Sequence, residues 1–374
     1  MQSSVARWAS LAAVLALLSA CATTGGTGTT EDPVEGPVSG PSGETVSPSG
    51  AVWPLKTRHH VDLWLHGYAM LQDDTTLVPY FRRGYKSEMN ALKNRSNVST
   101  QLDANTSRLR TRFAQNSGIV NGQFIALYFD SFDEMLEAMD LFIRAEGEPR
   151  AAGNQEAASA IALLAGYFPG PADRDWVRLF VQSLRDENSR FYRAYWDQQQ
   201  RERAGVRTAV DNLWQTNRPR LQRFLDNTSQ SQGEILLSLP LNGEGRTLSA
   251  GKRQNATAVT YPVRPSDAIE AIYVITHEIV GQIATTAVND NVTPNERREG
   301  LADRYIGSAA VRAGAILLEK AAPELVDGYA RYYLRSANRS VGSSPSASLA
   351  TGFPLPDGIR AALVRQIEVV LGGI

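Results

Sequence analysis

Apolar residues recur at helical spacing through most of the chain after residue 52. The segment Ser131 to Glu134 is typical of a helix start, because Ser and Glu stand three residues apart, and apolar residues follow it at intervals of three and four. The same periodicity predicts three further helices, over 153–166, 173–202 and 206–226, the last kinked near Pro219.

Strand patterns are fewer. Ile235–Leu241 alternates apolar and polar residues, and Ala256–Tyr261 is a second short candidate. The glycine-rich segment 242–245 between them is typical of a hairpin turn. The apolar run 123–129 fits either a strand or a buried helical turn. We therefore predict a mostly α (α+β) fold, with a helical N-terminal region (52–230) and a C-terminal region (231–374) that contains a small antiparallel sheet.

The N-terminus has a different pattern. Residues 1–20 contain a short apolar core of signal-peptide length, ending in Leu18-Ser19-Ala20-Cys21. This ending resembles the lipobox of bacterial lipoproteins. The resemblance implies cleavage before Cys21, lipidation of its thiol and acylation of the new amino group, palmitate being a typical chain. Residues 21–51 are mostly Gly, Pro, Ser and Thr, which predicts a flexible tether.

The lipobox implies a bacterial membrane lipoprotein. Residue 22 is Ala rather than the Asp associated with inner-membrane retention, which favours the outer membrane. We expect the folded region to lie in the periplasm or at the cell surface, attached through lipid.

Composition narrows the possible chemistry. The 38 Lys and Arg residues nearly balance the 39 Asp and Glu, so a nucleic-acid partner is not expected. The single cysteine excludes an internal disulfide and any site with several thiolate ligands. An imidazole-based metal site would have to use the four histidines His59, His60, His66 and His277.

Two segments near residue 280 carry the most specific chemistry. The first is a helix expected to begin at Ser266 and Asp267, to run to about Val288, and to contain His277 and Glu278. The second begins at Thr293-Pro294-Asn295-Glu296, a strong helix start, and continues through Glu299-Gly300-Leu301-Ala302-Asp303. Zinc-peptidase helices place two His four residues apart and a Glu directly after the first.

These segments resemble the gluzincin metallopeptidases of the thermolysin and aminopeptidase N type, over about residues 235–340. The resemblance implies a zincin-like helix pair in which His277 and Glu299 are zinc ligands and Glu278 is the general base. It also implies that Asp303 supports His277 from the second helix. Glu299 follows His277 by 22 residues, close to the spacing in that group.

Position 281 departs from the gluzincin pattern. The second zinc histidine should stand there, and the residue is Gly281. A catalytic zinc normally has three protein ligands and a water, so the implied site is degenerate. The alternatives for a third ligand are Gln282 and one of the histidines His59, His60 or His66.

Three functions remain open from the sequence. The favoured one is a membrane-anchored lipoprotein whose degenerate gluzincin-like domain binds a peptide, cell-wall material or a protein rather than catalysing a reaction, with no cofactor or with zinc at low occupancy. The second is an atypical active zinc metallopeptidase, a hydrolase. The third is a purely structural helical lipoprotein in which the His-Glu pair is coincidental.

Overall fold

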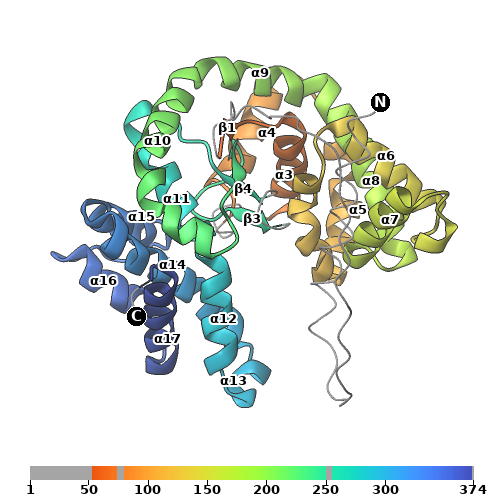
Figure 1. Ribbon diagram of the computed structural model, residues 1–374. Coiled ribbons are helices and arrows are strands. Elements are labelled where there is room, and N and C mark those ends of the chain that lie inside the picture. The colour runs from red at the N-terminus through yellow and green to blue at the C-terminus, as the bar shows by residue number, and fades with distance from the viewer. Residues whose placement is uncertain (1–52, 74–79, 250–254, 373–374) are drawn as a thin grey trace, which may run out of the picture.

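The structure, a computed structural model, describes residues 53–73, 80–249 and 255–372. These residues are mostly helical and contain a four-stranded sheet (Figure 1). The mostly α (α+β) class predicted from the sequence is therefore confirmed. The signal peptide, Cys21 and the tether over 21–51 lie outside the described residues.

The region before the sheet is built almost entirely from helices. They are α3 (His59–Leu71), α4 (Tyr85–Arg95), α5 (Gln101–Gln115), a 3-10 segment (Ser117–Tyr128), α6 (Phe132–Arg144), α7 (Gln155–Tyr167), α8 (Pro171–Glu187), a π-helical turn (Asn188–Tyr192), α9 (Arg193–Glu202) and α10 (Ala204–Asn227). The helices predicted over 153–166, 173–202 and 206–226 are present, with Pro219 inside α10. The run 123–129 lies in the 3-10 segment, so it is helical and not a strand. In Figure 1, α8, α9 and α10 follow one another in an arc around the sheet.

Helix α3 is the centre of the N-terminal region. It is apolar on nearly every side, and all its residues from His60 to Leu71 are buried. Gly67 allows α8 to pack closely against it, because a Cβ at this position would lie 2.6 Å from the ring of Phe180. The absence of a side chain at Gly67 therefore sets the distance between α3 and α8.

This contact predicts a difference between two helical glycines. Gly67→Ala should lower the free energy of unfolding by about 1–3 kcal/mol, because the added methyl overpacks the contact with Phe180. Gly166→Ala, in α7, is the matched control, since a Cβ there meets no atom within 4 Å. It should leave stability unchanged or raise it by up to about 1 kcal/mol. Urea unfolding of both variants measures the difference, and equal effects would contradict the close packing.

The sheet consists of β1 (Leu55–Lys56), β2 (Gly233–Ser238), β3 (Arg246–Ser249) and β4 (Asn255–Thr260), in the order β1-β2-β4-β3. The pairs β1–β2 and β2–β4 are parallel, and β3–β4 is antiparallel. The sheet is thus mixed rather than antiparallel as predicted. The reason is that β4 lies between β2 and β3, so segment 242–245 leads into an edge strand instead of closing a hairpin between the two predicted strands.

The sheet also joins the two halves of the chain. β1 precedes α3 in sequence, yet it pairs with β2 in the C-terminal region. Trp53, just before β1, packs edge-on against Trp214 of α10 with ring centroids 6.4 Å apart, and its indole donates to the backbone carbonyl of Gln230. The buried apolar residues of both regions form one continuous core cluster.

The helices of the C-terminal region form a second group on one side of the sheet (Figure 1). They are α11 (Ile269–Ile279), α12 (Gly281–Asn291), α13 (Pro294–Arg298), α14 (Leu301–Ala321), α15 (Val326–Ser336), α16 (Pro345–Gly352) and α17 (Asp357–Val370). α11 packs against β4, and α12 packs against α14 and α17. The capping box predicted at Thr293 and Glu296 is present at the start of α13.

The helix expected to run to about Val288 is interrupted. It begins after a 3-10 turn (Pro265–Asp267), in which Asp267 pairs with Arg264 at 2.8 Å, and it ends at Ile279. Helix α12 then continues at an angle of 41°. The side-chain amide of Gln230 donates to the carbonyl of Ile279 (2.9 Å), so a residue distant in sequence contacts the backbone at the end of α11.

Within the described part of the chain, no single helix has the length and apolar character of a membrane span. One bent pair, Pro265–Ile279 with Gly281–Asn291, meets those two criteria together. Most of α11 is buried inside the protein.

Candidate functional site

The candidate site forms where the end of α11 meets the chain entering β3. α11 is apolar over most of its length, which buries it between β4 and the C-terminal helices. His277 and Glu278 are in its last turn. The side chains of both residues are only 9% and 10% exposed. Because the other residues of α11 are mostly apolar and buried, the helix also places these two polar side chains inside the core.

Glu278 connects the helix to the sheet. Its Oε1 lies 2.9 Å from His277 Nδ1, and the same oxygen accepts a hydrogen bond of 3.0 Å from the backbone N–H of Gly245. A Cβ at Gly245 would collide with the carbonyl oxygen of Ala258 on β4. Only glycine therefore allows the chain to approach closely enough for this bond.

An aromatic ring covers the other side of His277. The ring of Tyr333, from α15, stacks on the imidazole with centroids 5.2 Å apart and planes at 22°. His277 Nε2 is buried and has no hydrogen-bond partner among the described residues. The contact at Nδ1 and the stacked tyrosine ring thus hold the imidazole in place, while its Nε2 has no hydrogen bond to a described residue.

Charges around the imidazole alter its proton affinity. Burial alone would lower the pKa of His277, but the hydrogen bond to Glu278, the charge of Glu278 and that of Glu244 together raise it. Burial also raises the pKa of Glu244, and the negative charge of Glu278 adds to this effect. Two carboxylates therefore raise the proton affinity of this buried imidazole, Glu278 by direct contact and Glu244 through its charge.

A pocket of about 240 Å³ opens beside this cluster. Its wall includes Glu244 and the ring of Tyr333, with the buried apolar side chains of Phe81 and Val311. Two exposed arginines, Arg83 and Arg339, also line it; the other lining residues are Asn242, Gly243, Gly307, Ser308, Ser336, Ala337 and Phe353. We call this the Glu244 pocket. It combines an acidic group, an aromatic wall and basic side chains in a small volume.

The remaining predicted site residues lie elsewhere. Glu299 is exposed at the C-cap of α13, and Asp303 is exposed in the first turn of α14. The acids that act on the pKa of His277 are Glu278 and Glu244, whereas Glu299 acts on Tyr305. Of the residues the gluzincin resemblance implies, the structure brings together His277 and Glu278.

The other three histidines are engaged in the N-terminal core on α3. His60 Nε2 lies 2.9 Å from the carbonyl of Phe129, and His66 lies 3.0 Å from both Tyr85 Oη and Glu187 Oε1. His59 packs edge-on against Trp196. Burial lowers the pKa values of His59 and His60 to about 4, so these imidazoles are neutral at pH 7.

The donor set does not fit a catalytic zinc. Such a metal needs three converging protein ligands, and no group of three or more His, Cys, Asp or Glu side chains suited to a metal occurs in the described parts of the chain. Position 281 has room for a side chain, since a Cβ there meets no atom within 4 Å, but glycine supplies no ligand. We assign no chemical step to a metal.

Sequence reasoning missed Glu244 and gave Tyr333 no role. Glu244 stands between two glycines in a segment read as a simple turn, and its burial depends on Gly245 packing against β4. Tyr333 was one of several tyrosines at helical spacing. A carboxylate flanked by glycines just before a strand was the available signal for Glu244.

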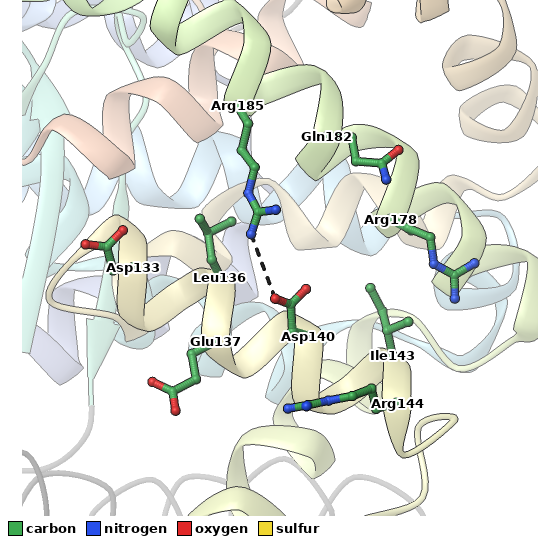
Figure 2. Close-up of a pocket in the computed structure, with 9 residues that line it drawn as sticks. All are labelled: Asp133, Leu136, Glu137, Asp140, Ile143, Arg144, Arg178, Gln182 and Arg185. Carbon is green, nitrogen blue, oxygen red and sulfur yellow. Dashed lines mark ion pairs between the residues drawn. The ribbon is translucent and has the colours of Figure 1, made fainter.

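A second hollow lies on the surface between α6 and α8. Its volume is about 600 Å³, and its charged lining residues, Asp133, Glu137, Asp140, Arg144, Arg178 and Arg185, are all exposed. Figure 2 shows these side chains around the groove, with Asp140 and Arg185 paired at 3.8 Å. These side chains are solvated and carry charges of both signs, so each would contribute little to the binding of a ligand. The groove is therefore a weaker candidate for a binding site than the Glu244 pocket.

Comparisons with known proteins give no assignment. No family model matches the chain, and no match was found among curated proteins or solved structures.

The electrostatics of the site yield a prediction. Glu278→Gln should lower the pKa of His277, because the amide cannot stabilise the imidazolium as the carboxylate does while burial continues to disfavour it. Glu244→Gln should lower it less, since Glu278 has the larger effect. Glu299→Gln is the control and should leave it unchanged. A pH titration of ¹³C-labelled histidine resonances measures all three, and an unchanged pKa in the Glu278 variant would contradict the arrangement.

Proposed function

We propose that this chain is a membrane-anchored lipoprotein whose folded region binds a small ligand in the Glu244 pocket. The observation that carries the proposal is the buried His277–Glu278 pair beside that pocket, with Nε2 of His277 unpartnered. A buried polar group without a hydrogen-bond partner costs free energy, and perturbed pKa values cluster at functional sites. The lipobox-like segment ending in Cys21 supports the anchor.

Several features favour binding over hydrolysis. Glu278 already contacts His277 and Gly245, whereas a general base must be able to reach a water. Position 281 has no ligand, and it lies in α12, which is bent by 41° from the helix that carries His277 and Glu278. The residues of a gluzincin-like site are thus only partly assembled, which supports a degenerate site that retains a pocket.

The chemistry of the pocket indicates a ligand class. Glu244 can accept hydrogen bonds from an ammonium group, and Arg339 can pair with a carboxylate. Arg83 already donates to Asn338 and Ser336, so it adds positive charge to the pocket. A volume of about 240 Å³ lies below the range typical of drug-sized ligands, roughly 300–1,000 Å³. A short peptide or a peptide fragment of the cell wall, with one amine and one carboxylate, fits these requirements.

The binding proposal is tested with alanyl-alanine, using the full chain in detergent. Glu244→Gln should weaken binding by at least about tenfold, because it removes the charge facing the ammonium group. Glu299→Gln is the matched control, since Glu299 is exposed at the end of α13. Isothermal titration calorimetry gives both affinities.

Two results would overturn the binding proposal. Stoichiometric zinc in the wild type, with peptide hydrolysis abolished by Glu278→Gln, would establish an active metallopeptidase. Absence of binding by alanyl-alanine, by its N-acetylated and C-amidated forms and by longer alanine peptides would favour a purely structural lipoprotein.

The anchor yields a separate prediction. Cys21→Ser should abolish incorporation of an alkyne-labelled palmitate and release the protein from the membrane fraction, because the thiol is the attachment point of the lipid. His277→Ala should retain both label and membrane association, since it leaves the thiol of Cys21 in place. A Cys21→Ser variant that is still labelled and remains in the membrane would contradict the lipobox interpretation.

A further inference from the structure

A second cluster of polar groups surrounds Arg82, which stands between two residues that line the Glu244 pocket and is not itself one of the lining residues. Phe81 forms an isolated antiparallel bridge with Leu241, and the N–H of Arg82 donates to the carbonyl of Pro240 (2.7 Å). Phe81 and Arg83 line the pocket. The guanidinium of Arg82 instead lies over the ring of Tyr85, at 5.3 Å from its centroid. Arg82 therefore belongs to a separate environment.

Only one of the three guanidinium nitrogens of Arg82 makes a hydrogen bond to a described residue. Its Nη1 donates to Glu88 Oε2 at 2.6 Å. Its Nε and Nη2 are shielded from solvent and have no hydrogen-bond partner among the described residues. These two nitrogens form one edge of the planar group, with parallel N–H bonds that match the two oxygens of a carboxylate or phosphate.

Tyr195 belongs to the same cluster, because its ring lies 5.7 Å from that of Tyr192 and its hydroxyl interacts electrostatically with Arg82. Tyr195 is 8% exposed, and its hydroxyl is buried without a partner in the described structure. The π-helical turn before α9 precedes it in the chain, and such turns are frequent at functional sites. Burial raises the pKa of Tyr195 to about 12, against the nearby positive charge of Arg82. The hydroxyl therefore remains protonated and able to donate.

The surrounding charges suit an anion. Arg203 is 5% exposed, donates to the carbonyl of Tyr261 at 2.7 Å, and acts on Tyr195 together with Arg82. The acids that face this cluster are Glu88, already paired with Arg82, and Asp62, whose pKa burial raises to about 7. Near or below pH 7 the two arginines are therefore incompletely neutralised.

We propose that the Nε–Nη2 edge of Arg82 and the hydroxyl of Tyr195 form a binding site for a small oxyanion, a carboxylate or a phosphate. Arg203 adds positive charge to this site. The site uses none of the residues that line the Glu244 pocket, so the proposal stands independently of the proposed function.

The test is calorimetric titration of the full chain in detergent at pH 6, with inorganic phosphate and acetate as separate probes. One or both should bind; phosphate alone indicates a phosphate site, and acetate alone indicates a carboxylate site. Arg82→Lys keeps the charge but loses the two-pronged edge, and it should weaken binding by at least about tenfold. Tyr195→Phe should also weaken binding, by a few-fold or more.

Thermal unfolding without added anion provides a second readout. Tyr195→Phe should not lower the melting temperature, because its hydroxyl has no partner to lose. Tyr68→Phe is the control: its hydroxyl donates to the carbonyl of Ile119 (3.0 Å), so the variant should lose stability and keep its anion affinity. Glu244→Gln should also keep anion affinity.

Three results would overturn the proposal. They are no binding of either anion up to about 10 mM, an affinity that neither Arg82→Lys nor Tyr195→Phe reduces, or a loss of stability in Tyr195→Phe as large as that in Tyr68→Phe.

Discussion

The hydrogen bond from the backbone of Gly245 to Glu278 joins the sheet to the helix that carries the candidate site. Carboxylates are costly to bury, and one oxygen of this one is contacted by both a backbone N–H and an imidazole. The bond requires glycine at 245, since any side chain there would meet β4. The position of Glu244, the raised pKa of His277 and the wall of the pocket all depend on this close approach.

The core around the site explains why such a polar cluster is tolerated. Tyr333 stacks on His277, and its neighbours Tyr329 and Tyr332 pack against it, with ring centroids 4.6 and 5.2 Å away. These aromatic rings give α15 a large buried face against α11. The site is consequently part of the hydrophobic core and not an addition on a surface loop, which fixes the direction of its polar groups.

The helices were largely predictable because their determinants are local. The periodicity that predicts α7 to α10 and the cap at Thr293 involve residues within a few positions of each other. The strand order was not predictable in this way, because β4 pairs with β2, which is not its neighbour in sequence, and β3 lies at the edge. The interruption after Ile279 coincides with a contact from Gln230, which is distant in sequence.

Two of the four main residues of the candidate site, His277 and Glu278, were predictable from the sequence. His277 and Glu278 are adjacent in sequence, so their pairing needed no tertiary information. Glu244 and Tyr333 reach them from segments more than 30 and 50 residues away, through the sheet and through α15. The arginine edge near Tyr195 had no sequence signal, because unpartnered donors become visible only when all the surrounding elements are in place.

The central claim is that the pocket beside His277 receives the ligand. Its most direct test follows the ring resonances of ¹³C-labelled His277 during titration of the full chain with alanyl-alanine. The account predicts that the His277 signals shift and saturate together with binding, while those of His60 and His66 stay in place. Saturable binding that leaves the His277 resonances unmoved would contradict it.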